Sequence, residues 1–227
     1  MNFRSDNESP AAPEILEALA CANRDSAHSY GADRYTADLQ ARFCELFETD
    51  LTVYPVATGT AANALCLGEL TPPYGAVYCF EESHINASEC GAPEFYSGGA
   101  KLVGLPAEHG RIAPQTVSGI LAATGYHGEH ESAPVVLSLT NASEAGTVYG
   151  PAAVAELAAI TREAGMAVHM DGARFANALA TLSYNRQAKA LLERLDANHD
   201  KVIDRREAAG DPELSDKFNL VDIDGVP

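Results

Sequence analysis

An aspartate at the end of an apolar run is the first candidate for chemistry. The run, residues 166–171 (MAVHMD), ends in Asp171, and Arg174 follows three positions later. A carboxylate at a buried strand end requires a cation or strong hydrogen-bond donors. Arg174 could be that cation in a structural salt bridge. Alternatively, Asp171 could face a protonated heterocyclic nitrogen, with Arg174 holding an anionic oxygen beside the ring.

The segment 57–63 (ATGTAAN) contains residues that could bind a phosphate. Thr58, Gly59 and Thr60 lie where a predicted strand over 51–57 turns into a predicted helix. Glycine allows a ligand to approach the backbone, and the first amides of a helix together with two hydroxyls can hold a phosphate. The glycine spacing and the lysine of a P-loop are absent. The same residues could also be no more than a helix N-cap.

Two histidines and one polar loop are further candidates. His84 follows a predicted strand over 75–80, with Glu89 five residues later, and could stack on a flat ring or move a proton. His130, in the polar segment GYHGEHESA, is a second candidate base. Either could be an ordinary surface histidine. Three residues after the strand predicted over 133–140 could contact a ligand or simply form a turn: Thr140, Asn141 and Ser143.

The elements that must position these residues are short apolar strands alternating with helices. The expected strands cover residues 51–57, 75–80, 100–106, 133–140 and 166–171, and helical patterns precede, separate or follow them at 13–23, 34–48, 58–70, 113–123 and 150–165. This alternation predicts an α/β fold with a mostly parallel sheet and helices on both faces. Ligands in such sheets bind at the carboxyl ends of the strands. A phosphate cup, a stacking imidazole, hydroxyl contacts and an acid for a ring nitrogen together describe pyridoxal phosphate.

Composition restricts the partners. The 227 residues carry a formal net charge of -17, which argues against nucleic acids and anionic membrane surfaces. The polar N-terminal residues do not resemble a secretory signal, and no apolar run reaches membrane-spanning length. The five cysteines include no C-x-x-C motif, so we expect reduced thiols and a cytoplasmic location.

Several of these segments are long enough to indicate a family. Residues 1–182 resemble the threonine aldolases, β-eliminating lyases of the aspartate-aminotransferase-like fold (pyridoxal-phosphate fold type I). The matching text is FRSDN (3–7), YGADRYTADLQARFCELF (30–47), ATGTAANALCL (57–67), ESHINASECGAPEF (82–95), SLTNASEAGTVY (138–149) and HMDGARFANALA (169–180).

The resemblance implies cleavage of β-hydroxy-α-amino acids such as L-threonine to glycine and an aldehyde, by a homo-oligomer. It also implies a role for each matching residue. Thr58, Gly59 and Thr60 would bind the cofactor phosphate, and Asp171 would face the pyridine nitrogen. His84 would stack on the ring and assist proton transfer, and His130 would act at the substrate hydroxyl. Arg174 would bind the cofactor or the substrate carboxylate, and Ser5 would contact the substrate carboxylate.

The family also uses a lysine that forms a Schiff base with the cofactor. That lysine stands in a motif of Ser, Gly, Thr, Lys, Asn and Gly beyond the DGARFANA segment, and these 227 residues contain no such motif. The lysines present are Lys101, Lys189, Lys201 and Lys217. We therefore expect residues 1–182 to form an incomplete cofactor domain that is inactive alone. The alternatives are a non-catalytic calcium-binding protein and a truncated or fused gene product.

Residues 183–227 have a different pattern, in which a helix leads into the acidic segment DANHDKVIDRRE. Its oxygen-bearing residues stand at the ligand positions of an EF-hand, with a backbone carbonyl at position 7. These positions are Asp196, Asn198, Asp200, Val202, Asp204 and Glu207. Lys201 replaces the usual glycine at position 6, so we expect weakened Ca²⁺ binding; a solvated acidic loop is the alternative.

Overall fold

The computed structural model describes residues 10–123, 130–183 and 194, in two compact units, residues 1–55 and 56–227. The first unit contains α1 (Pro13–Ala22) and α2 (Arg34–Phe47). Pro13 opens α1, where its missing N–H costs no helical hydrogen bond. Asp33 caps α2, since its Oδ1 accepts a 3.0 Å hydrogen bond from the Thr36 amide. Hydrogen bonds to this carboxylate also lower the pKa of Asp33.

The strand expected over residues 51–57 does not form. This segment has no strand pairing, and the side chain of Tyr54 is 80% exposed. The backbone bonds instead with the Gln40 side chain, which accepts from the Val53 amide at 3.0 Å and donates to the Leu51 carbonyl. Pro55 has no N–H to offer a ladder, so an apolar run here did not guarantee a strand.

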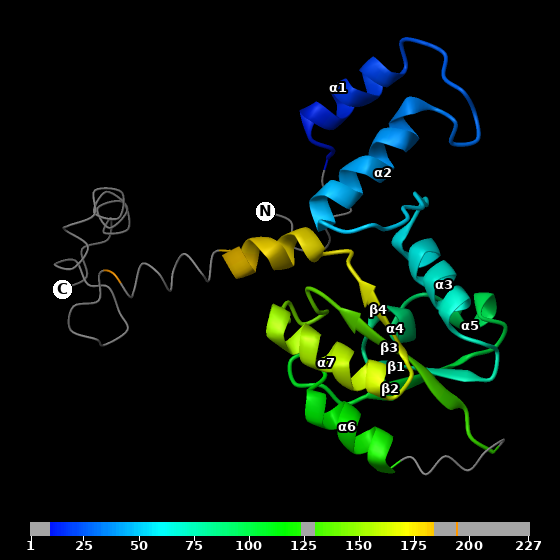
Figure 1. Cartoon of the computed structure of the whole chain (residues 1–227), viewed down its shortest axis with the longest axis vertical. Helices are drawn as coiled ribbons and strands as arrows, with labels where there is room; N and C mark the ends of the chain where they lie inside the picture. The colour runs from blue at the N-terminus through cyan, green and yellow to red at the C-terminus, as the bar shows by residue number, and fades with distance from the viewer. Residues whose placement is uncertain (1–9, 124–129, 184–193, 195–227) are drawn as a thin grey trace. The chain divides into compact units, whose positions relative to one another are not determined.

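The second unit holds the sheet (Figure 1). Its elements in chain order are α3 (Gly59–Leu70), β1 (Gly75–Phe80), α4 (His84–Ala87), α5 (Ala92–Tyr96), β2 (Lys101–Leu105), α6 (Pro114–Ala123), β3 (Ala133–Thr140), α7 (Pro151–Glu163) and β4 (Ala167–Asp171). Residues 175–183 are helical as well. The expected strands at β1 to β4 and the longer helices are confirmed, whereas α4 and α5 were not expected because each is shorter than two helical turns.

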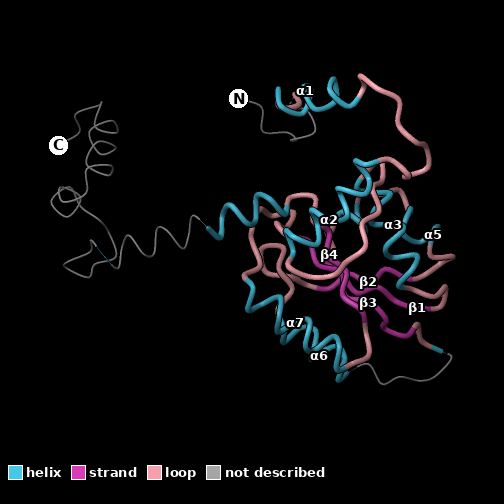
Figure 2. The backbone as a smooth tube through the Cα atoms, turned by 45° about the horizontal axis from the view of Figure 1, so that its top comes forward, coloured by secondary structure: helices cyan, strands magenta, loops and turns pink. Residues whose placement is uncertain are grey.

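All four strands are parallel, in the order β2-β1-β3-β4. Their carboxyl ends therefore lie at one edge of the sheet, where Thr140 of β3 is paired with Asp171 of β4. The sheet lies between two helical layers, with α6 and α7 on one side and α3 and α5 on the other (Figure 2). This arrangement confirms the expected α/β fold with helices on both faces.

Alternating strand residues fill two cores. The larger one packs α6 and α7 against the sheet, and its buried members include Tyr78, Leu137, Leu139 and Leu157. The smaller one, on the α3 side, contains Leu67, Val77, Cys79, Ile85 and Val136. Neighbouring strand residues point to opposite faces of the sheet, and each face is covered by one of these cores. The strand β1 is therefore buried along its whole length.

Other sequence-based expectations have different outcomes. No helix among the described residues is long and apolar enough to cross a membrane. All five cysteines are free thiols, and the cytoplasmic location stays a prediction. The domain boundary expected near residue 183 and the EF-hand positions also stay predictions, since residues 184–193 and 195–227 lie outside the described part of the chain. The homo-oligomer stays a prediction as well.

Candidate functional site

The predicted site residues of the second unit, except His130, gather at the carboxyl edge of the sheet. Asp171 ends β4 and is 8% exposed. Its Oδ1 accepts from the Ala173 amide at 3.0 Å, and its Oδ2 accepts from the Asn63 side-chain amide of α3 at 3.0 Å. This carboxylate has donors but no ion pair within the described residues. A buried carboxylate in this setting is suited to a cationic ligand atom.

Arg174 does not form the salt bridge that was one reading of its spacing from Asp171. Its Nε donates to the Ala142 carbonyl at 3.2 Å, which ties the segment after β4 to the loop after β3. The guanidinium is partly exposed. The structure therefore contains no ion pair between Asp171 and Arg174. The guanidinium of Arg174 keeps other N–H donors that could bind an anion.

Asn63 joins two buried carboxylates. Its Nδ2 donates to Asp171 and also to Oε1 of Glu89, at 2.8 Å. The same Oε1 lies 2.8 Å from Nδ1 of His84. The Glu89 side chain is completely buried, whereas that of His84 is 49% exposed. A continuous chain of hydrogen bonds thus runs from the half-exposed imidazole, through Glu89 and Asn63, to Asp171.

The start of α3 lies one turn before Asn63. Thr58 is the N-cap, and its Oγ1 accepts a 3.1 Å hydrogen bond from the Ala61 amide. Thr58 and Gly59 are exposed, and a Cβ placed on Gly59 would meet no atom within 4 Å. The N-cap reading of this segment is therefore correct, and open space remains in front of the first amides, where a phosphate could bind.

The loop after β3 is held mainly by its own contacts. The side chain of Asn141 bonds both backbone groups of Tyr149, and Ser143 Oγ lies 2.8 Å from Thr147 Oγ1. These contacts favour turn chemistry over ligand binding for Asn141 and Ser143. Glu144 serves the site differently, because its Oε1 accepts the His84 amide at 3.0 Å and so fixes the start of α4.

A second histidine of the site region, His169, is buried two residues before Asp171 on the same face of β4. His169 is paired through Nδ1 with Ser138 Oγ at 2.9 Å. Burial lowers the pKa of His169, and the negative charges of Asp171 and Glu89 oppose this effect only in part. The imidazole is therefore held neutral, as a structural part of the polar face under the site.

Two residues with candidate roles lie at the other edge of the sheet. His130 is exposed, ahead of β3, and Lys101 is exposed at the first position of β2. Because β3 has eight residues that rise about 3.3 Å each, the two edges are roughly 23 Å apart. Within a single chain His130 therefore lies at the edge opposite His84, and its role at the substrate hydroxyl stays a prediction. The distance also separates Lys101, the only lysine among the described residues, from Asp171.

Other predicted ligands fall outside the described part of the chain. These are Ser5 and the calcium positions Asp196, Asn198, Asp200, Val202, Asp204 and Glu207. Within the described residues, no group of three or more His, Cys, Asp or Glu side chains is placed to hold a metal ion.

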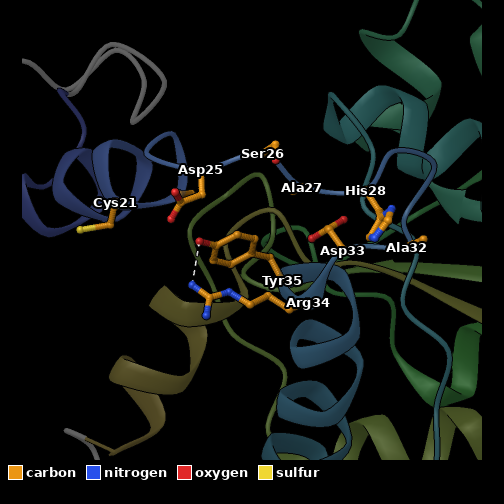
Figure 3. A pocket seen from close by; sticks show the side chains of 10 residues that line it. Cys21, Asp25, Ser26, Ala27, His28, Ala32, Asp33, Arg34 and Tyr35 are labelled. Carbon is orange, nitrogen blue, oxygen red and sulfur yellow. Dashed lines mark hydrogen bonds between the residues drawn. The ribbon is translucent and has the colours of Figure 1, made fainter.

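The first unit has a separate surface hollow of about 290 Å³, formed entirely by residues 21–35 (Figure 3). Arg34 lies at its wall, where Nη2 donates to the Tyr35 hydroxyl at 3.1 Å and the guanidinium stacks over that ring. The hollow contains none of the residues that gather at the strand ends.

Sequence reasoning missed Asn63 as a site residue and gave Glu89 no role. A signal existed for Asn63: it shares one face of α3 with the buried Ala64 and Leu67, and a polar side chain on such a face requires a partner. The partners come from 26 and 108 residues away, so only the folded chain identifies them.

Comparisons with known proteins identify the family of the chain. Residues 2–199 match the beta-eliminating lyase family. A low specificity L-threonine aldolase of Pseudomonas aeruginosa is 44% identical over 180 residues, and one of a Pseudomonas species is 41% identical over 180 residues. Each alignment covers 79% of this chain and 51% of the relative, so the chain spans about half the length of these relatives.

A solved structure has the same fold. The threonine aldolase of Leishmania major superimposes with a TM-score of 0.70 at 28% sequence identity. The match covers 76% of this chain and 49% of that one. The aspartate-aminotransferase-like fold expected from the sequence is confirmed for the aligned part.

Proposed function

We propose that this chain, which belongs to the beta-eliminating lyase family, binds pyridoxal phosphate and contributes to cleavage of β-hydroxy-α-amino acids of the threonine type. The observation that carries the proposal is the buried Asp171 carboxylate, which has no cation among the described residues and lies close to the open start of α3. The 44% identity to a low specificity L-threonine aldolase supports the substrate class.

The residues present fit the cofactor. The Gly59 and Thr60 amides at the start of α3 would bind its phosphate, and Gly59 leaves room for the approach. Asp171 would hold a proton on the pyridine nitrogen, because a buried carboxylate favours a cationic partner. Arg174 has donors left for an anionic oxygen of the cofactor or substrate. The chemistry that pyridoxal phosphate supplies when bound is an electron sink for the pair left at Cα.

His84 is the residue that would move the proton. Its ring is half-exposed at the strand ends and is held from behind by the buried Glu89. We propose that His84 takes the proton of the substrate β-hydroxyl as the Cα–Cβ bond breaks and then gives this proton to Cα, which yields glycine and an aldehyde. Ser5 and His130 stay proposals for substrate contacts, the latter only if the site is shared between copies of the chain in a homo-oligomer.

We further propose that no lysine in the described part of the chain forms a Schiff base with the cofactor. The support is the position of Lys101, roughly 23 Å from Asp171 across the sheet. Incubation with pyridoxal phosphate, borohydride reduction and peptide mass spectrometry tests this. We expect no specific lysine adduct and no glycine release from threonine by the chain alone. A single reduced lysine together with glycine release would contradict the proposal.

Cofactor binding is tested by titrating pyridoxal phosphate into the full chain. We expect Asp171→Ala to weaken binding about 10- to 100-fold, as for a lost charged hydrogen bond. The matched control is Glu82→Ala, an exposed carboxylate ahead of α4, which should bind as the wild type does. Equal affinity of wild type and Asp171→Ala would contradict the proposed site.

Calcium binding is a second candidate function, supported by the EF-hand spacing of residues 196–207 alone. Calorimetric titration of the full chain with Ca²⁺ tests it, and Asp196→Ala should abolish the heat. Wild-type protein that gives no heat would remove this candidate.

A further inference from the structure

Glu89 is the most deeply buried acid of the site, although the proposed chemistry assigns it no role. Its side chain has no exposed surface, and its Oε2 has no hydrogen-bond partner. Its Oε1 contacts both His84 and Asn63. Burying a carboxylate is costly, so a chain that retains one at this position requires a compensating interaction or role.

The direction of the His84–Glu89 hydrogen bond follows from Asn63. Nδ2 of Asn63 can only donate, and it donates to Oε1 of Glu89 at 2.8 Å. That oxygen therefore accepts from Asn63, and as part of an ionised carboxylate it has no hydrogen of its own to donate. Nδ1 of His84 lies 2.8 Å from the same oxygen, so Nδ1 carries the hydrogen and donates it. The neutral ring then has its lone pair on Nε2.

The other contacts of His84 leave Nε2 available. The backbone amide of His84 is held by Oε1 of Glu144 at 3.0 Å, which fixes the residue at the start of α4. Within the described residues Nε2 has no hydrogen-bond partner, and 49% of the side chain is exposed. The ring is thus oriented through its buried nitrogen and can exchange a proton through its outer one.

We propose that Glu89, supported by Asn63, is a positioning residue that fixes the tautomer of His84, so that only Nε2 can accept a proton from a substrate. The substrate part of this inference rests on the proposed function. A proton taken up at Nε2 makes an imidazolium, and the adjacent buried carboxylate stabilises that charge in a medium of low dielectric constant. Asn63 holds Glu89 in place and couples it to Asp171.

The test is the tautomer of His84 in the full chain without cofactor. Long-range ¹H–¹⁵N spectra of histidine-labelled protein at mildly alkaline pH distinguish Nδ1–H from Nε2–H, and His84→Gln assigns the signals. We expect Nδ1–H in the wild type and loss of that form in Glu89→Leu. Glu89→Gln offers an amide oxygen and should restore it. His28, which is exposed and in the first unit, is the internal reference and should not change.

Two results would overturn the inference: Nε2–H on His84 in the wild type, or unchanged Nδ1–H in Glu89→Leu. If Glu89→Leu does not fold, the wild-type tautomer and Asn63→Ala, which should reduce the Nδ1–H population, still decide the matter. Because no cofactor or substrate is present, the outcome is independent of the proposed function. A wild-type Nδ1–H signal without pyridoxal phosphate binding would refute that function and leave the tautomer inference intact.

Discussion

Asn63 and Asp171 are 108 residues apart in sequence and are joined by a 3.0 Å hydrogen bond from amide to carboxylate. The second hydrogen of the same amide goes to Glu89. One side chain of α3 therefore provides a donor for two buried carboxylates, Asp171 at the end of β4 and Glu89 between α4 and α5. The two acids can lie on one face of the sheet because an amide stands between them.

Removal of this amide should destabilise the protein. Asn63→Ala leaves an oxygen of Asp171 and one of Glu89 with one donor fewer, and we expect a loss of about 2–3 kcal/mol in the free energy of unfolding. Urea unfolding followed by far-ultraviolet circular dichroism measures it. The control is Asn86→Ala, an exposed amide that donates to the Glu81 carbonyl at 2.7 Å and should cost under about 0.5 kcal/mol. Equal losses in the two variants would contradict the role of Asn63.

The predicted site residues that the structure brings together share a simple property. Thr58, Gly59, His84 and Asp171 all lie at or just after strand ends or helix starts, and the parallel topology brings such positions to one edge. Periodicity was sufficient to locate the four strands. Their partners were not predictable in the same way, since a hydrogen bond such as Asn63 to Glu89 depends on how α3 packs on the sheet.

The error over residues 51–57 has a physical cause. This run is apolar, but Pro55 and the Gln40 side chain take the backbone away from any sheet. The role of His130 at the substrate hydroxyl stays a prediction, because the eight residues of β3 place this histidine at the opposite edge of the sheet within one chain.

The pH dependence of stability should include a contribution from His169. Burial holds its pKa below the ordinary value of 6.5 in the folded protein. Between the lowered pKa of the folded protein and the ordinary pKa of 6.5, His169 is protonated in the unfolded chain but not in the folded one. The contribution of His169 to the free energy of unfolding is therefore fully present above pH 6.5 and is lost as the pH falls through this range. His169→Gln keeps a polar partner for Ser138 and removes the titration. Relative to this variant, wild-type protein should lose stability in urea as the pH falls below 6.5; parallel curves would contradict this.

The five thiols should react in an order set by their exposure. Cys21, Cys66 and Cys90 are exposed, Cys44 is partly exposed, and Cys79 is buried in β1. Burial also raises the pKa of Cys79, which reduces its thiolate population at neutral pH. Timed alkylation with peptide mass spectrometry should show three fast cysteines and Cys79 last. In urea all five should react at similar rates, and early labelling of Cys79 in folded protein would contradict its placement.

Gly110 should be intolerant of a side chain for two separable reasons. Its φ of 77° lies in the left-handed region, and an added Cβ would lie 2.8 Å from Oγ of Ser143, in the loop after β3. Gly165 is the matched control, with a φ of 72° and no atom within 4 Å of an added Cβ. We expect Gly165→Ala to cost about 1 kcal/mol from backbone strain alone.

Gly110→Ala should cost about 1–3 kcal/mol more than Gly165→Ala, since Ser143 also bonds Thr147 and cannot move freely. The same change should disturb the loop that carries Glu144, the residue that holds the His84 amide. Amide spectra of Gly110→Ala should therefore show shifts at His84 that Gly165→Ala lacks. Equal stability losses and an unshifted His84 amide would contradict the coupling between the segment of Gly110 and the loop that carries Ser143 and Glu144.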